Sequence, residues 1–493
     1  QTRAATSVWI CVNQPESWWS DPLRRDAAER NAATLTWISS QNRANVTVLD
    51  RSSPGNGWTN DKAGVGAARK LLFETILAKA CGAGPGGRTS HEPEPTQGQT
   101  TNGSSGRTAN RMWTRLSDLG SGPESSQDLI VSLDADTTMD PGYLESVVET
   151  FARHPGATGL AARYHHGLTG DEAQDRAMLR YELYLRYTFC NLLDSATPFA
   201  FTAMGSAIAF PVWAYQRSGG MQPRSAAEDF YLLQKLAKLG PLALWTDRRV
   251  HPSSRPSRRV PMGTGPAVAR GIRGDWGPYH FFAPDWFDEV AAAIASFSAS
   301  FDDPGLHEKD WAEDGLSQVT TFLGQQLRCE DPWATLRRNH RDRTRFVRAC
   351  HERFDGLRIL QYLRRRWADG CQDQARCDEQ HLTRFLERRA HRIPDRFRSL
   401  VAPFLEGAWR FETASVESLD ALRHVLAEWE DEGRRKRQET WHDFIGLYGA
   451  TGHEQGRSSR GNGARKRATD DPRSTADDAD PSVRPSGKGG DTT

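Results

Sequence analysis

Short apolar runs and amphipathic stretches alternate over the first 134 residues. Residues 6–13, 45–50 and 126–134 are rich in β-branched and other apolar side chains, which is typical of buried strands. Between these runs, residues 27–40 and 64–79 place apolar side chains at helical spacing. The order strand, helix, strand, helix, strand predicts an α/β fold built on a parallel sheet.

A similar alternation continues toward residue 300. We expect helices at residues 140–151, 171–193 and 227–239, and strands at residues 158–164 and 242–245. The uncharged run 196–215 is about as long as a membrane span, which needs roughly 20 residues. Pro198, Gly205 and Pro211 interrupt it, so we interpret the run as buried core. The mean hydropathy of −0.67 also argues against an integral membrane protein.

Changes in composition divide the chain into parts. Residues 1–300 carry the alternating pattern, interrupted at residues 82–126 by a Gly-, Ser- and Thr-rich insertion of low complexity. Residues 305–448 are rich in Arg and Glu and read as a helical C-terminal region. Residues 449–493 are polar and Gly-rich, which predicts a disordered tail.

Charge and cysteine content narrow the class of protein. The 64 Lys and Arg residues balance 63 Asp and Glu residues, which argues against a general nucleic-acid binder. The seven cysteines are scattered and form no CxxC pair, so neither a disulfide scaffold nor a zinc knuckle is indicated. No signal segment is visible at the N-terminus as given. We expect reduced thiols in a cytoplasmic protein, either free in solution or peripheral at a membrane.

The acidic pair Asp134 and Asp136 follows the apolar strand at residues 126–134. Ligands of open α/β sheets bind beyond the carboxyl ends of the strands. Two carboxylates there provide oxygen ligands for a divalent cation, which in turn neutralises charge on a leaving diphosphate. The alternative interpretation is a solvated acidic turn or a helix N-cap.

Other polar residues are predicted to lie near the same sheet edge. Asp50 ends the second strand, where a carboxylate accepts hydrogen bonds from a base or ribose; alternatively it forms a turn. Arg69 lies one turn into a helix that begins at glycines, a position suited to phosphate or simply to solvent. Glu228 and Asp229 open a later helix, either as dipole complement or as a general base.

The matching stretches TSVWICVNQ, VTVLDRSS, GVGAARK, DLIVSLDADTTMDPGYL, TAMGSAIAF and AAEDFYLLQKL stand in the order found in a known family. Before about residue 300 the chain resembles family 2 glycosyltransferases with the GT-A fold. The resemblance implies a mixed, mostly parallel sheet flanked by helices, here with an α-helical C-terminal region.

The resemblance also implies roles for individual residues. Asp229 would be the catalytic base, supported by Glu228. Mn²⁺ or Mg²⁺ would bind Asp136 and Asp134, and His251 is a candidate third ligand in a basic loop. The remaining assignments are Asp50, Arg69, Asp134 and Arg259 on the donor side, and Gly205 and Ser206 on the acceptor side.

The implied activity is metal-dependent, inverting transfer of a sugar, of the hexosyltransferase type, from a nucleotide-diphosphate donor to a hydroxyl. The acceptor class stays open among saccharides, lipid-linked molecules and small molecules. The first loop, NQPESWWSD, departs from the family pattern, so the donor base also stays open. The Gln-x-x-Arg-Trp motif of processive members is not found near residues 250–280.

Two alternative functions compete with this interpretation. The sequence Asp134-Ala135-Asp136-Thr137-Thr138 also fits the motif of haloacid-dehalogenase-like phosphatases. That family places its motif on the first strand, whereas two strands and two helices are expected before it here. A catalytically inactive GT-A domain that binds nucleotide or glycan is the non-enzymatic alternative.

Overall fold

The computed structural model describes residues 5–59, 64–81, 128–303 except 223, 225, 258 and 259, 315–441 except 372 and 408, and residue 446. The predicted insertion at residues 82–126 and the predicted tail at residues 449–493 lie outside the described residues. Residues Gln1–Thr451 group as one compact unit. The division of the chain near residue 300 stays a prediction.

The first two apolar runs form a parallel strand pair. Strand β1 (Val8–Asn13) pairs with β2 (Val46–Arg51) in a register that joins Val8 to Val46 and Asn13 to Arg51. The flanking helices are η1 (Glu16–Trp19), α1 (Arg25–Ser40) and α2 (Val65–Ala80). The predicted strand, helix, strand, helix order is confirmed here.

A four-stranded mixed sheet follows in the order β3-β6-β5-β7. Strand β6 runs antiparallel to both β3 and β5, whereas β5 and β7 are parallel. Strands β4 and β8 form a separate antiparallel pair that the hydrophobic pattern did not predict, because two-residue strands carry no periodicity. The bounds are β3 (Leu129–Ser132), β4 (Thr138–Met139), β5 (Gly159–Ala161), β6 (Ile208–Pro211), β7 (Leu242–Ala243) and β8 (Val250–His251).

Helices cover this sheet, and the three predicted ones are present. They are α4 (Tyr143–Arg153), α5 (Glu172–Asp194), α6 (Val212–Arg217), α7 (Glu228–Leu239) and α8 (Thr264–Gly271). The uncharged run at residues 196–215 is largely buried and contains β6, so the buried-core interpretation is confirmed. Among the described residues, no helix has the length and apolar character needed to cross a bilayer.

The C-terminal region is helical, as predicted. Polar N-caps start several of its helices: the side chain of Asp355, for example, accepts a hydrogen bond from the Arg358 backbone N–H at 3.1 Å. The bounds are α9 (Pro284–Ser296), α10 (Ala299–Asp302), α11 (Gly315–Leu327), α12 (Ala334–Asn339), α13 (Arg343–Arg353), α14 (Gly356–Gly370), α15 (Gln374–Glu387), η2 (Ala390–Arg392), α16 (Asp395–Leu405) and α17 (Val416–Glu439).

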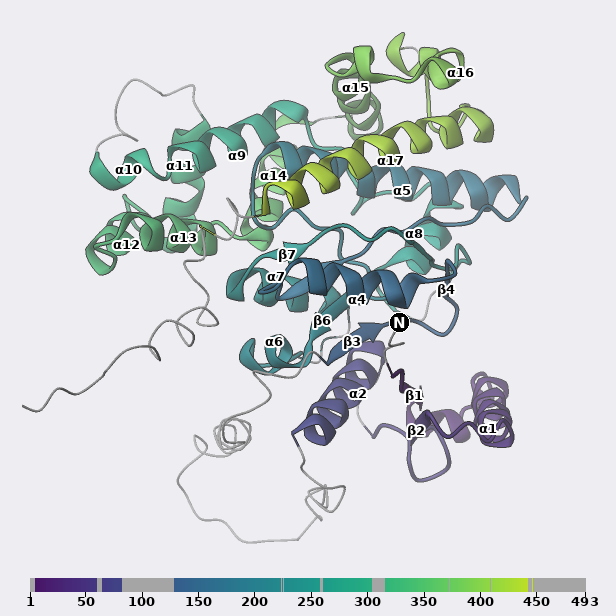
Figure 1. Cartoon of the computed structure of the whole chain (residues 1–493). Helices are drawn as coiled ribbons and strands as arrows, with labels where there is room; N and C mark the ends of the chain where they lie inside the picture. The colour runs from purple at the N-terminus through teal and green to yellow at the C-terminus, as the bar shows by residue number, and fades with distance from the viewer. Residues whose placement is uncertain are drawn as a thin grey trace, which may run out of the picture. The chain divides into compact units, whose positions relative to one another are not determined.

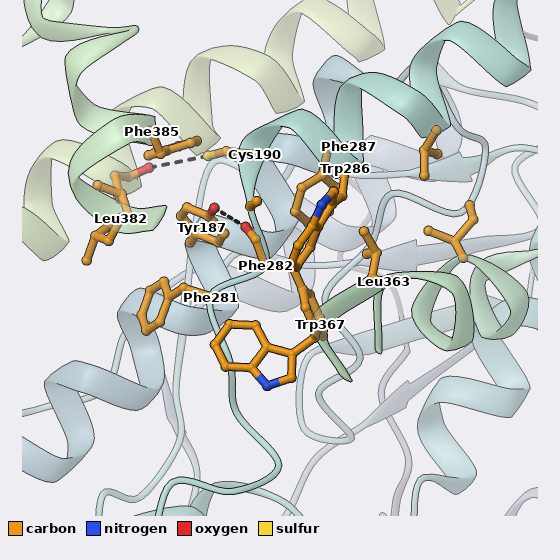
Figure 2. Close-up of a cluster of buried hydrophobic side chains, with 14 of the residues drawn as sticks. Tyr187, Cys190, Phe281, Phe282, Trp286, Phe287, Leu363, Trp367, Leu382 and Phe385 are labelled. Carbon is orange, nitrogen blue, oxygen red and sulfur yellow. Dashed lines mark hydrogen bonds between the residues drawn. The ribbon is translucent and has the colours of Figure 1, made fainter. Parts of the chain in front are cut away.

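Helix α5 joins this region to the sheet. Helix α17 packs along α5 (Figure 1). An aromatic cluster joins Tyr187 of α5 to Trp286 of α9, Trp367 of α14 and Phe385 of α15 (Figure 2). The Tyr187 hydroxyl donates a hydrogen bond to the carbonyl of Phe282 within this cluster. Because α5 is covered on several sides, its buried positions extend around the helix rather than along one stripe.

Buried ion pairs reinforce the same junction. Arg186 of α5 binds Glu430 of α17 at 2.6 Å, and Arg434 of α17 binds Glu430 at 2.7 Å. The Arg434 guanidinium also donates to the backbone carbonyls of Ala161 and Leu244, each at 2.7 Å, where β5 and β7 end. A C-terminal helix therefore satisfies backbone groups at the end of the sheet.

Candidate active site

The first acidic motif, Asp134 and Asp136, lies just beyond the carboxyl end of strand β3, and the second, Glu228 and Asp229, begins helix α7. Strand β3 ends at Ser132, and the backbone N–H of Thr137 donates to the carbonyl of Asp134 at 3.0 Å, which closes a turn. Asp134 and Asp136 lie in this turn. Asp136 forms an ion pair with Arg255 at 2.7 Å. The structure thus places both carboxylates beyond the strand end, as the sequence predicted.

Arg69 connects the acidic turn to the start of α7. Its guanidinium binds Asp134 Oδ1 and Glu228 Oε1, each at 2.5 Å. The side chain is almost completely buried. Burial opposes the charge of Arg69, but Asp134, Glu228 and Asp229 outweigh this and raise its pKa above the ordinary value. One cation therefore holds two carboxylates that are 94 positions apart in the sequence.

Two glycines make this close packing possible. A Cβ atom at Gly205 would overlap the guanidinium group of Arg69. A Cβ atom at Gly66 would lie 2.6 Å from the carbonyl oxygen of Arg224. Gly205 was predicted to line the acceptor side, and this role stays a prediction; the structure shows that Gly205 provides the space for Arg69. Ser206, its neighbour, is buried and lines the same cleft.

The backbone just before α7 is strained. Ala227 has φ +60°, a left-handed conformation that is uncommon for a residue with a side chain. It presents Glu228, which is buried, and Asp229, which is half-buried, at the helix start. Burial raises the pKa of Glu228, with a further contribution from Asp229, although Arg69 opposes the shift. Asp229 Oδ1 accepts a hydrogen bond from the Phe230 N–H at 2.7 Å, which leaves Oδ2 as the second proton-accepting atom.

Asp50 is engaged by its own loop. Its Oδ1 accepts from the N–H groups of Ser52 and Ser53, each at 2.9 Å, and its Oδ2 accepts from Asn56 at 3.1 Å. Although partial burial opposes the charge, these hydrogen bonds hold the pKa of Asp50 well below its usual range. The turn-forming interpretation of Asp50 is therefore visible in the structure, and its contact with a nucleotide base stays a prediction.

The predicted third metal ligand has a protein partner. His251 Nε2 lies 2.8 Å from Asp140 Oδ1; His251 belongs to β8, and Asp140 follows β4 directly. Within the described ranges, no group of three or more His, Cys, Asp or Glu side chains is arranged to hold a metal ion. Asp134 and Asp136 still offer the hard oxygen ligands that Mn²⁺ and Mg²⁺ prefer, because each carboxylate has a second oxygen beside the one that binds arginine. Arg259 lies outside the described residues.

One cleft of about 1490 Å³ brings together most of the predicted site residues, but neither Asp50 nor His251 lines it. Its polar end is lined by Arg69, Asp134, Asp136, Glu228, Asp229 and Arg255. Arg255 was not singled out from the sequence beyond its place in a basic loop. Residues of α5 and α14 also line the cleft, and no local sequence motif pointed to them.

Comparison with known families tests the interpretation of this cleft. Residues 129–287 match the family model described as glycosyl transferase family group 2. This part of the chain is a family 2 glycosyltransferase domain. The glycosyltransferase match includes Asp134, Asp136, Glu228 and Asp229, whereas Arg69 precedes it. No curated protein and no solved structure matches the chain.

The family match covers the acidic turn. In a family 2 glycosyltransferase domain, a nucleotide-sugar donor and an acceptor are the expected partners. The match begins at β3, so Asp134 and Asp136 lie close to the start of the matched region. A family 2 domain supports glycosyl transfer as the activity, whereas the role of the five residues in the turn stays a prediction.

Proposed function

We propose that the chain is a metal-dependent, inverting glycosyltransferase of the hexosyltransferase type. The observation that carries the proposal is the Arg69 bridge, which brings the Asp134 turn and the Glu228-Asp229 pair into one cleft of a family 2 domain. In this proposal, some residues at the polar end of the cleft bind the donor, and Asp229 is the catalytic base.

The donor side is formed by Asp134, Asp136 and Arg255. The two carboxylates would hold Mn²⁺ or Mg²⁺, which when bound neutralises charge on the departing diphosphate. Arg255 binds Asp136 at 2.7 Å and is exposed enough to exchange this partner for a phosphate oxygen. His251 contributes indirectly, because it bonds to Asp140 and so fixes the strand that follows the acidic turn.

The base in this proposal is Asp229. Its carboxylate accepts the proton of the acceptor hydroxyl while the hydroxyl oxygen forms a bond to the anomeric carbon. The bond from that carbon to the diphosphate oxygen breaks, and the nucleoside diphosphate leaves with the electron pair. A base on the face opposite the leaving group produces inversion. Glu228 acts as a positioning residue, because it holds Arg69 rather than the substrate.

The cysteines support a cytoplasmic location within this proposal. All seven are free thiols. Disulfides form and persist mainly in oxidising compartments, so unpaired thiols fit a reducing one.

A thermal-shift screen tests the donor side. UDP, GDP, CMP and TDP are compared with and without Mn²⁺ on the wild type, Asp136→Ala and the exposed control Asp26→Ala. One nucleotide should raise the melting temperature of the wild type and the control only with Mn²⁺, because a ligand of the native state stabilises it by mass action. Asp136→Ala should lose this shift. An equal shift in Asp136→Ala would refute the metal role, and no shift with any nucleotide would refute the donor class.

A further inference from the structure

The cleft continues beyond the carboxylates as an apolar surface. Phe230 follows Asp229 directly and packs against Phe201, with ring centroids 5.9 Å apart. Both rings line the cleft, together with Phe199. The proposed catalytic base therefore lies at the border between a polar and an aromatic environment.

Helix α14 of the C-terminal region lines this apolar end. Its first turn is attached to α7, since Gln234 Oε1 accepts a hydrogen bond from the Leu357 N–H at 2.8 Å. Gly356 allows the close approach: a Cβ atom there would lie 3.2 Å from the Cβ of Phe199. The wall is therefore fixed to the same helix that carries Asp229.

One face of α14 is turned to the cleft. Leu357, Leu360 and Arg364 are spaced by three and four residues, which places them on one side of a helix, and all three line the cleft. The adjacent face carries Leu363 and Trp367 in the buried cluster of Figure 2. The core thus fixes the rotation of α14 and with it the direction of the cleft-lining face.

Arg364 is a cation without a protein partner in the described part of the chain. Its neighbours on α14 are paired: Arg365 binds Asp369 at 2.9 Å and Arg366 binds Glu289 at 2.7 Å. On α5, burial raises the pKa of Tyr184 to about 12, and the charge of Arg364 acts against this shift. Arg364 therefore lies close enough to α5 to provide a positive charge at the apolar end of the cleft.

A fully polar acceptor would make no favourable contact with the apolar wall formed by Phe201, Leu357 and Leu360. Apolar walls favour an apolar ligand, because binding removes apolar surface of both from water. An unpaired guanidinium favours an anion through charge-assisted hydrogen bonds. Both properties occur in the cavity that contains Asp229, which points to one molecule with a hydroxyl, an apolar body and an anionic group.

We propose that the acceptor is an anionic amphiphile whose apolar body lies against Phe201, Leu357 and Leu360 and whose anionic group pairs with Arg364. The role as acceptor rests on the proposed transferase function, whereas the binding surface does not. The C-terminal region would then determine acceptor specificity for the family 2 domain.

Calorimetric titration with dodecanoate, kept below its micellar concentration, tests the surface. The full chain should bind dodecanoate saturably and bind butyrate at least tenfold more weakly. Arg364→Ala should weaken dodecanoate about tenfold and leave dodecanol unchanged. Leu360→Gln should weaken both long-chain ligands about tenfold, and Leu357→Gln provides a second variant in case Leu360→Gln fails to fold. Arg365→Ala is the matched control and should bind as the wild type does.

The same titration separates this inference from the proposed function. Dodecanoate should bind equally well with and without UDP and Mn²⁺, and Asp136→Ala should lose the nucleotide but keep dodecanoate. The inference would be overturned if dodecanoate bound equally well to Arg364→Ala, Leu357→Gln and Leu360→Gln. It would also be overturned if bound nucleotide excluded dodecanoate. If the wild type bound dodecanoate but no nucleotide, the transferase proposal and the acceptor role would be overturned. The proposed binding surface for an anionic amphiphile would stand.

Discussion

The strand pair β1–β2 and the four-stranded sheet arise from similar apolar runs, yet they are packed very differently. Every residue of β5 and β6 is buried, whereas β1 and β2 are mostly half-buried. On helix α1, which lies beside the strand pair, Trp37 is 62% exposed to solvent. The difference shows that an apolar run predicts a strand but not what covers it.

The carboxylates divide between these two regions. Asp134 and Glu228 are held beside the buried sheet through Arg69, and Asp229 follows Glu228 at the start of α7. Asp50 lies on the strand pair and is bound by its own loop. We infer that the sheet region holds the proposed diphosphate-binding carboxylates and the base in fixed positions, and that Asp50 of the strand pair adds a donor contact from a less buried loop. Three of the four variants below test this contrast.

The largest effect is expected at the base. Asp229→Asn should reduce sugar transfer by about 10²- to 10⁴-fold, because the amide cannot accept the proton. Nucleotide binding with Mn²⁺ should persist, since Asp229 lies outside the proposed donor side. Single-turnover assays measure transfer, and the thermal shift measures binding. Transfer at the wild-type rate would place the base elsewhere.

Removing the central cation should destabilise the sheet region. Arg69→Met leaves the buried carboxylate of Glu228 without its partner, which costs about 3–5 kcal/mol of unfolding free energy; Asp134 also loses its partner, but its side chain is partly exposed to water. Chemical denaturation measures this loss. Lys70→Met, one position away in a half-buried i,i+4 pair with Glu74, is the control and should cost less than about 1 kcal/mol, because this pair is in contact with water. Equal stability of the two variants would contradict the bridging role of Arg69.

A pH dependence should come from the buried core of the C-terminal region, where His351 of α13 packs against Phe297. Burial lowers the pKa of His351 to about 4 from an ordinary value of 6.5. The unfolded chain therefore binds more protons between these values, and stability is present above pH 6.5 and falls as the pH drops toward 4. The contribution of His351 is about 3 kcal/mol at full effect.

Denaturant midpoints at pH 7 and pH 5 for wild type and His351→Leu measure this contribution. The variant should lose less stability between the two pH values. His391, which lies outside the buried core, gives the control His391→Leu. The pH dependence of the control should match that of the wild type. An unchanged pH dependence in His351→Leu would show that the buried imidazole is not the group that titrates.

The smallest stability effect is expected in the strand pair. Asp50→Ala removes hydrogen bonds in a half-buried loop, so it should cost about 1 kcal/mol. The nucleotide-dependent thermal shift should fall more than this stability does, because Asp50 is a proposed donor contact. Asn56→Ala, which removes a bond to the same carboxylate, is the control. A large loss of stability in Asp50→Ala would break the contrast between the two regions.

Local patterns in the sequence predicted most of the helices and strands of residues 1–300 and the position of the acidic turn at Asp134 and Asp136. Hydrophobic periodicity located α5 and α7 within about two residues. It did not reveal the Arg69 bridge, because the pairing of Arg69 with Glu228 spans 159 positions and depends on the space above Gly205. The cleft-lining face of α14 has a readable three- and four-residue spacing, but only tertiary packing shows what that face meets.

The contacts of Arg434 with the carbonyls of Ala161 and Leu244 also affect the order of assembly during synthesis. Residues 129–287 are synthesised before α17, so until α17 is made these two carbonyls lack their donor and the buried Arg186 lacks Glu430. We expect the nascent domain to stay protease-sensitive until α17 emerges from the ribosome. A family 2 domain that is encoded upstream is thus completed by a helix that is encoded far downstream.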